Sequence, residues 1–291
     1  MARQILALLW LLSAAPAFAD GLPWLRLASS KSKSAPKPSL DERFLFQPTR
    51  FPAGNWDQIP SSCREITFTS DDGTKLYGWF APVPNPVATV LYCHGNGGNI
   101  SYYGEWLKQL QAEKRITVLI FDYRGYGKSE GKPTVEGALA DAAAAREELA
   151  WLTEMKTSDI VLWGTSLGGA VAIQLAAEER PRGLILESTF SSFREVADYH
   201  QPALSWLVPK DRLNSARTIE TIRCPLLQCH GTADRVIPFE QGEKLHAAAT
   251  SATPKTFIRL PKLGHNDLPT EEYDRALTRF LRTLPQPATR P

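Results

Sequence analysis

The stretch DIVLWGTSLGGAVAIQLAAEE, residues 159–179, decides the fold class of this chain. Its first part, DIVLWG, carries the continuous apolar run expected of a strand that is buried on both faces. Its last part, GGAVAIQLAAEE, is Ala-rich and typical of a helix. Between them, Gly164 and Gly168 flank Ser166, because a turn this sharp leaves no room for a Cβ beside neighbouring backbone. The stretch therefore predicts a strand, a tight turn that presents Ser166, and a helix.

Alternating strands and helices are expected on both sides of this stretch. An antiparallel hairpin is predicted at residues 63–82, since the turn Asp72-Gly73 separates two alternating runs. This alternation predicts an α/β fold with a mainly parallel sheet covered on both faces, and ligands bind beyond the carboxyl ends of such strands. The other expected strands are residues 87–93, 116–122, 183–188, 225–230 and 255–261, and the other expected helices are residues 101–114, 134–155, 239–249 and 271–284.

Polar residues at the ends of the expected strands form a candidate catalytic triad. Ser166 stands in a Gly-x-Ser-x-Gly motif between a strand and a helix, which is the context of a nucleophilic serine. A serine hydroxyl needs a base, and His265, after the last strand, lies where the chain order Ser, acid, His puts it. Asp234, after the penultimate strand, is the expected acid that orients the imidazole. Glu187 ends the preceding strand and is the competing acid.

Acyl transfer to a serine also needs donors for the oxyanion. The backbone N–H of Leu167, next after the serine, is one expected donor. The Gly-rich loop HGNGGN, residues 94–99, is expected to supply the other through the N–H of Asn96, with Gly97 as second choice. In the next loop, Asp122 and Arg124 are expected to form a structural pair, although Arg124 could instead meet an acidic substrate.

Several motifs occur in the order found in the α/β-hydrolase superfamily, and over residues 63–285 the chain resembles that superfamily. More narrowly, it is similar to the branch of depalmitoylase-like and serine-aminopeptidase-like hydrolases with a short lid. The resemblance implies a three-layer α/β-hydrolase fold with an eight-stranded, mostly parallel sheet in the order 1-2-4-3-5-6-7-8. It also implies Ser166, Asp234 and His265 as the triad. The motifs are HGNGGN, FDYRGYGKSEG, GTSLGG, ESTF, HGTADRVIP and GHND.

The function expected from these residues is hydrolysis of a carboxylic ester or thioester through an acyl-enzyme on Ser166. Such chemistry requires no metal and no organic cofactor, and the expected partner is a small-molecule or acylated substrate. A serine peptidase of the aminopeptidase type would use the same triad and is the alternative. A binding protein that keeps the fold without catalysis is a further alternative, which the complete triad argues against. The aromatic residues of the lid could line an acyl pocket or pack on the sheet.

The N-terminus has the organisation of a secretory signal peptide. Arg3 precedes an apolar run at residues 5–12, and small residues lead to the A-x-A site before Asp20. A secreted or periplasmic protein is therefore expected, the alternative being a membrane anchor formed by an uncleaved N-terminus. The expected organisation is a signal peptide at 1–19, a linker and N-terminal arm at 20–60, the hydrolase domain at 61–286 with a short lid at about 189–223, and a tail at 287–291.

The composition argues against one broad class of function. The formal net charge is +2, close to neutral for 291 residues. Nucleic-acid-binding domains gather basic residues on one face or helix. Here the basic cluster Lys31, Lys33 and Lys37 lies in a Ser/Pro-rich stretch that is typical of a solvated linker, so no nucleic-acid partner is expected.

Overall fold

The eight expected strands form one sheet in the order β2-β3-β6-β4-β7-β8-β9-β10, which is the order 1-2-4-3-5-6-7-8 when these strands alone are numbered. The computed structural model describes residues 38–267 and 270–287, so the expected signal peptide at 1–19 lies outside the described residues. Only the pairs of β3 with β2 and with β6 are antiparallel. The strands are β2 (Arg64–Thr69), β3 (Lys75–Ala81), β4 (Ala88–Cys93), β6 (Ile116–Asp122), β7 (Val161–Thr165), β8 (Gly183–Glu187), β9 (Leu226–Gly231) and β10 (Lys255–Leu260).

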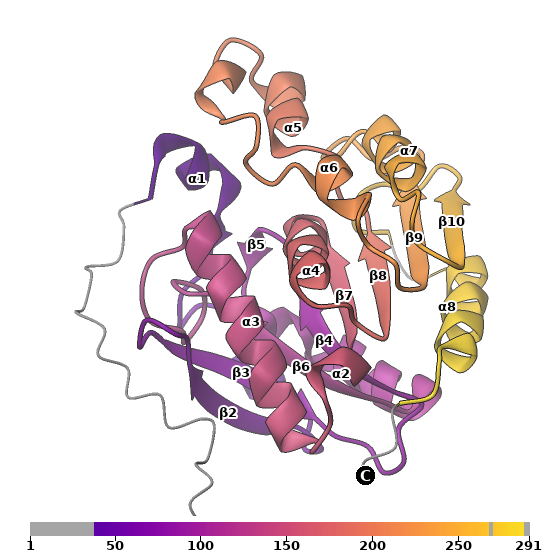
Figure 1. Cartoon of the computed structure of the whole chain (residues 1–291). Coiled ribbons are helices and arrows are strands. Elements are labelled where there is room, and N and C mark those ends of the chain that lie inside the picture. The colour runs from indigo at the N-terminus through magenta and orange to yellow at the C-terminus, as the bar shows by residue number, and fades with distance from the viewer. Residues whose placement is uncertain (1–37, 268–269, 288–291) are drawn as a thin grey trace, which may run out of the picture. The chain divides into compact units, whose positions relative to one another are not determined.

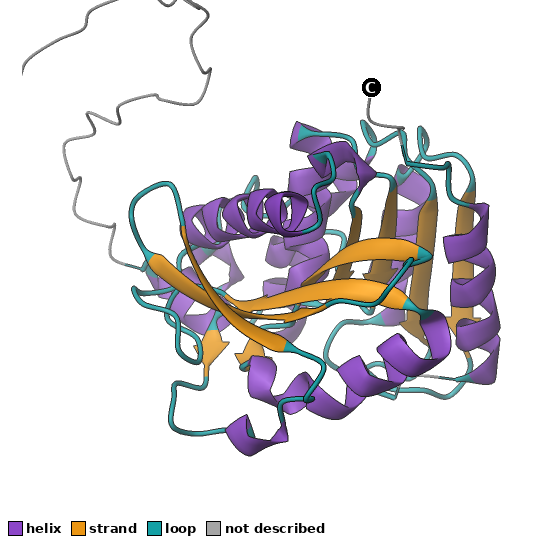
Figure 2. Cartoon of the chain, turned by 90° about the horizontal axis from the view of Figure 1, so that it is seen from below, coloured by secondary structure: helices purple, strands orange, loops and turns teal. Residues whose placement is uncertain are grey.

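Helices cover both faces of this twisted sheet, as Figure 2 shows. Buried residues of α3 and α4 belong to one hydrophobic cluster, and those of α2 and α8 to the cluster on the other face. The three-layer α/β fold expected from the sequence is thus confirmed. The α-helices of the described residues are α1 (Leu40–Leu45), α2 (Gly104–Gln109), α3 (Val135–Leu152), α4 (Leu167–Glu178), α5 (Phe193–His200), α6 (Ser215–Ile219), α7 (Phe239–Ala248) and α8 (Glu271–Thr283).

The pleat of the central strands explains their continuous apolar sequence. In β4, Leu91 and Cys93 pack in the cluster that contains α3 and α4, whereas Val90 and Tyr92 pack in the cluster that contains α2 and α8. Successive side chains of a strand point to opposite faces. A strand with helices on both faces therefore favours apolar residues at successive positions, as Val90 to Cys93 of β4 show.

The N-terminal arm is more ordered than the sequence indicated. Ser39 and Glu42 form a capping box that starts α1, with the Ser39 N–H donating to Glu42 Oε2 at 2.7 Å. Strand β1 (Gln47–Pro48) then pairs in parallel with β5 (Gly97–Gly98), which lies in the loop after β4. The arm therefore reaches the carboxyl ends of the central strands.

The segment expected to form the lid lies above the same end of the sheet. It contains α5, a short 3₁₀ turn at Ser205–Leu207 and α6. In Figure 1, α1 and α5 both lie at this end of the molecule, beyond the carboxyl ends of β7 and β8. Among residues 38–267 and 270–287, no helix combines the length and the apolar character needed to cross a bilayer.

Candidate active site

Ser166 lies at a sharp turn between β7 and α4. Its backbone is left-handed in φ, at 54° with ψ −121°, and its side chain is largely buried. The backbone packs so closely that a Cβ on Gly168 would lie 1.9 Å from the Cys93 carbonyl oxygen, and one on Gly164 would lie 2.2 Å from the Gly168 carbonyl oxygen. Both glycines of the motif are therefore required by close approach, and the strained turn places Ser166 at the start of α4.

Asp234 and His265 form a hydrogen-bonded pair at the ends of β9 and β10. His265 Nδ1 lies 2.7 Å from Asp234 Oδ2. The other carboxylate oxygen, Asp234 Oδ1, accepts from the backbone N–H groups of Val236 and Ile237, each at 2.8 Å. These contacts fix the carboxylate, and a carboxylate that accepts from Nδ1–H leaves Nε2 of the imidazole as the proton acceptor.

His230 also contacts the Asp234 carboxylate. His230 Nε2 lies 3.3 Å from Asp234 Oδ2 and 2.9 Å from the Ile237 carbonyl oxygen. Burial raises the pKa of Asp234, but hydrogen bonds from His230, His265 and the Ile237 N–H outweigh burial and hold the pKa well below its usual range. Asp234 is thus a carboxylate at any pH near neutrality, as a group that stabilises an imidazolium must be.

A cavity of about 330 Å³ opens beside Ser166. The turn with Ser166, the loop after β4, the lid, the helix α1 and the loop after β9 all contribute to its walls. Neither Asp234 nor His265 is among the lining residues described, but Val236, in the same loop as Asp234, lines the cavity. The lining is mainly apolar and includes Leu45, Phe190, Phe193, Leu204, Leu207 and Ile237.

Comparisons with known proteins agree with this fold and site. A family model described as serine aminopeptidase, S33, matches residues 84–218. The protein YfhR of Salmonella typhi is 36% identical over 246 residues, which cover 77% of this chain and 83% of that protein. The protein WAV2 of Arabidopsis thaliana, described as α/β hydrolase domain-containing, is 32% identical over 70% of this chain and 72% of its own length. The chain belongs to the α/β-hydrolase superfamily.

The solved structures are similar in fold. The esterase Pf2001 of Pyrococcus furiosus superposes with a TM-score of 0.66 at 21% identity, over 82% of this chain and 99% of that one. This likeness shows the fold. The family model and the Arabidopsis relative show that the protein is a hydrolase of the α/β fold. The family resemblance stated from the motifs is therefore confirmed.

The two residues whose amides are expected to bind an oxyanion in this α/β-hydrolase line the cavity. Both Leu167 and Asn96 line it together with Ser166, whereas Gly97 pairs with β1 and is not among the lining residues described. Leu167 is the first residue of α4, where the backbone N–H has no partner within the helix. The Asn96 carbonyl accepts from the Gln47 N–H at 3.0 Å and from Tyr126 Oη at 2.7 Å, so the N-terminal arm holds this loop in place.

Glu187, the competing acid, has its hydrogen-bond partners on the face of the sheet that α2 and α8 cover. Thr165 Oγ1 donates to Glu187 Oε2 at 2.6 Å, and Tyr273 Oη donates to the other carboxylate oxygen. Burial raises the pKa of Glu187, although these two hydrogen bonds lower it in part. Both oxygens of Glu187 thus have partners away from His265, and Asp234 is the acid that contacts the imidazole.

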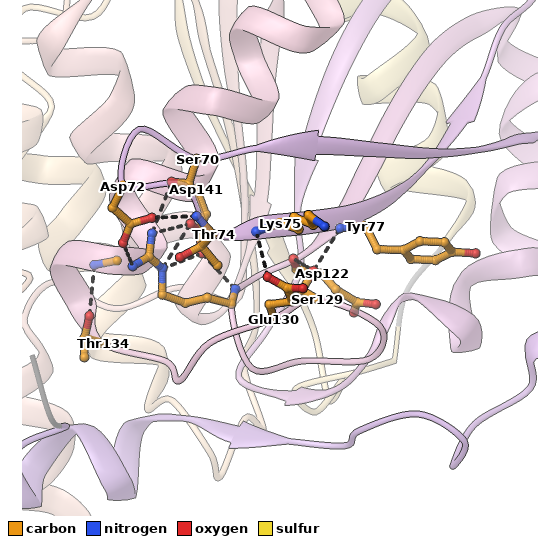
Figure 3. Close-up of polar contacts among 12 residues, drawn as sticks. Ser70, Asp72, Thr74, Lys75, Tyr77, Asp122, Ser129, Glu130, Thr134 and Asp141 are labelled. Atoms are coloured by element: carbon orange, nitrogen blue, oxygen red, sulfur yellow. Dashed lines mark hydrogen bonds and ion pairs between the residues drawn. The ribbon is translucent and has the colours of Figure 1, made fainter. Parts of the chain in front are cut away.

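Arg124 has a structural role, but its expected partner was wrong. Its guanidinium lies 2.7 Å from Asp141 Oδ1 and 2.7 Å from Asp72 Oδ2, the network shown in Figure 3. Asp122 instead accepts from the Ile100 N–H at 2.9 Å, which holds the loop after β4. The sequence could not reveal this exchange, because Asp141 lies in the middle of α3 and meets Arg124 only when α3 packs on the sheet.

The sequence analysis missed two contributors to the site. Phe44 and Leu45 of α1 line the cavity, although no helix was expected in the N-terminal arm. The Ser-x-x-Glu capping box at residues 39–42 is a signal that could have found this helix. His230 was not among the candidate residues, and nothing in the sequence indicated its contact with Asp234. Within the part of the chain that the structure describes, no cluster of three or more His, Cys, Asp or Glu residues is arranged to hold a metal.

Proposed function

We propose that this protein hydrolyses carboxylic esters or thioesters through an acyl-enzyme on Ser166. The observation that carries the proposal is the apolar cavity of about 330 Å³ that has Ser166, Leu167 and Asn96 in its wall. Apolar cavities with a few polar groups at one end bind ligands of matching polarity, with the polar groups fixing the orientation. An acyl chain would fill this cavity and bring its carbonyl carbon to Ser166.

In the proposed reaction, Ser166 Oγ attacks the acyl carbonyl carbon while His265 Nε2 takes the hydroxyl proton. Asp234 holds the imidazole by its Nδ1–H and stabilises the imidazolium that forms. The backbone N–H groups of Leu167 and Asn96 donate to the oxyanion of the tetrahedral intermediate, and one such donor is typically worth about 3 kcal/mol. The leaving alcohol or thiol takes the proton from His265. Water, deprotonated by His265, then releases the carboxylic acid and regenerates Ser166.

An aminopeptidase is the runner-up, and the description of the matching family model favours it. An aminopeptidase has to bind a protonated α-amine, for which a carboxylate is the natural partner. Among the lining residues described, Asp41 is the one carboxylate, and its Oδ2 lies 3.5 Å from Arg212 Nε. Arg212 also lies 3.0 Å from Glu42 Oε1, so its single charge is shared between two carboxylates, and Asp41 is the group that would bind an α-amine in an aminopeptidase. The ester proposal is preferred because the rest of the lining is mainly apolar and suits an acyl group.

Labelling with a fluorophosphonate probe tests the nucleophile. Wild-type protein should be labelled and Ser166→Ala should not. Ser188→Ala is the matched control, because Ser188 is a buried serine with positive φ that follows the neighbouring strand β8. It should label like the wild type. Equal labelling of Ser166→Ala and wild type would exclude the proposed acyl-enzyme. A binding protein that lacks catalysis would then be the better interpretation.

Substrate panels test the bond that is cut. We expect turnover of p-nitrophenyl esters and of acyl thioesters, and rates at least about 100-fold lower on aminoacyl p-nitroanilides. The reverse order of rates would favour the aminopeptidase.

We also propose that residues 1–19 direct export and are removed. The support is the sequence pattern of Arg3, the apolar run at residues 5–12 and the A-x-A site before Asp20. N-terminal sequencing of the expressed protein tests this. A start at Asp20 supports export, whereas an intact Met1 favours a membrane anchor.

A further inference from the structure

Exposed apolar side chains gather around the cavity. Of the nine large apolar residues that are exposed in the described part of the chain, six lie on α1, the lid or the loop after β9. They are between 43% and 68% exposed, and three of them also line the cavity. We call this set the apolar rim, and a patch of this kind beside a pocket commonly marks an interaction site. The rim consists of Leu40, Phe44, Tyr199, Leu204, Trp206 and Val236.

The two main parts of the apolar rim are tied together by buried charges. Arg212, in the lid, lies 3.0 Å from Glu42 Oε1 and 3.5 Å from Asp41 Oδ2 of α1, and both carboxylates are buried. Glu42 Oε1 also accepts from the Val135 N–H at 2.8 Å, which links α1 to the start of α3. The lid and α1, which are about 170 residues apart in sequence, are thus held together by these contacts. The apolar rim therefore has a defined structure.

Positive charge flanks the apolar rim. Arg43, Lys210 and Arg235 are exposed, and none of them forms an ion pair with a described acidic residue. By contrast, Glu195 and Asp198, the acidic residues of α5, are already paired with Lys244 and Arg194. The partner of this surface should therefore combine apolar groups with negative charge.

We propose that the apolar rim docks on an anionic phospholipid surface, with the cavity open toward the lipid. Trp and Tyr side chains favour the boundary between lipid and water, and Lys and Arg are drawn to anionic headgroups. A second copy of this chain would present the same positive charges and is therefore a poorer partner. The docking itself does not depend on catalysis. Where the proposed ester hydrolysis holds, acyl groups would pass from the lipid layer to Ser166 along Phe44 and Leu204.

The test is sedimentation of the full chain with vesicles, using the Ser166→Ala background to prevent turnover. Vesicles of phosphatidylcholine with phosphatidylglycerol should bind the protein, and added salt should weaken that binding. The combined variant Leu40→Ser, Tyr199→Ser and Trp206→Ser should bind at least about tenfold more weakly, because three apolar side chains lose their insertion. The three residues do not belong to the described lining of the cavity. Hydrolysis of a water-soluble acetate ester by this variant with Ser166 restored should stay within about twofold of wild type.

Trp151→Ser is the matched control. Trp151 is the most exposed of the large apolar residues, at 74%, but it lies 16 residues along α3 from Val135, or about 24 Å from the α1 end of that helix. This variant should bind vesicles like the parent. A second variant, Arg43→Gln with Lys210→Gln and Arg235→Gln, should bind anionic vesicles several-fold more weakly and bind phosphatidylcholine vesicles unchanged.

Three results would overturn the proposal. The first is that the full chain does not bind anionic vesicles. The second is equal binding by the parent and by the Leu40, Tyr199 and Trp206 variant, which would assign binding to the N-terminal segment. The third is a dimer, detected by light scattering, that the same variant dissociates while vesicle binding is unaffected. Because binding is measured without Ser166, failure of docking and failure of the proposed hydrolysis are distinguishable.

Discussion

Asp234 and His265, 31 residues apart in the sequence, are joined by a hydrogen bond of 2.7 Å between Oδ2 and Nδ1. The second oxygen of Asp234 accepts from Val236 and Ile237, which line the cavity beside Ser166. One carboxylate thus connects the imidazole with the wall of the cavity. A small displacement of the loop after β9 would therefore alter the base and the substrate pocket together.

Asp234→Asn should lower kcat for ester hydrolysis by about 10⁴-fold, because an amide in place of the carboxylate favours the wrong imidazole tautomer. KM should change little, since Asp234 does not itself line the cavity as described. Glu187→Gln is the matched control, because Glu187 is a buried acid at the end of the neighbouring strand with partners on the other face of the sheet. Its kcat should fall by less than about tenfold. Equal losses in steady-state assays of the two variants would contradict the assignment of Asp234 as the acid.

Ala197→Trp should shorten the acyl chain that the enzyme accepts. Ala197 lies on α5 in the wall of the cavity, so an indole there would fill part of the space that a long acyl chain needs. The ratio of kcat/KM for p-nitrophenyl octanoate to that for the acetate should fall at least about tenfold. Ala203→Trp is the control, because Ala203 is an exposed lid residue outside the described lining. A similar loss on acetate and octanoate would show that the cavity does not receive the acyl chain.

Gly168→Ala should destabilise the protein by about 3 kcal/mol or more, since its Cβ would lie 1.9 Å from the Cys93 carbonyl oxygen and backbone has to move. Thermal unfolding followed by circular dichroism measures this as a fall in Tm. Gly97→Ala is the control, because a Cβ at Gly97 meets nothing within 4 Å. Its Tm should stay close to that of wild type, and a comparable fall in both variants would argue against the close approach.

Asp122→Asn should stabilise the protein more at pH 8 than at pH 5. Burial raises the pKa of Asp122 to about 7, although the hydrogen bond from Ile100 N–H lowers it in part. Between about pH 4, the ordinary pKa of an aspartate, and pH 7, the folded chain holds a proton that the unfolded chain has lost. The contribution of Asp122 to stability is therefore full below about pH 4 and is lost as the pH rises to 7.

The asparagine keeps an oxygen for the Ile100 N–H and does not titrate. The gain in Tm over wild type should thus be larger at pH 8 than at pH 5 by about 2 °C or more. A gain of the same size at both pH values would mean that Asp122 is already ionised at pH 5 in the folded protein.

The sequence by itself determined the sheet and the position of the serine. Continuous apolar runs mark strands such as β4 and β7 because both faces of each strand meet helices. The two glycines around Ser166 mark the turn because no Cβ fits there. These patterns depend only on neighbouring residues, so they can be recognised in a single sequence. The strand order came from the family resemblance rather than from any local pattern.

Tertiary structure alone decided which distant residues meet. Glu187 is the last residue of β8, whereas Asp234 lies in the loop after β9 at the same end of the sheet. The pleat directs the Glu187 side chain to Thr165 and Tyr273, on the face that α8 covers. Arg212 joins the lid to Asp41 and Glu42 of α1 because the two segments pack side by side in the fold. The pairings of Glu187 join residues 22 positions apart, as for Thr165, and 86 positions apart, as for Tyr273. All these pairings depend on how separate segments pack against one sheet, which the residues next to each side chain in the sequence do not reveal.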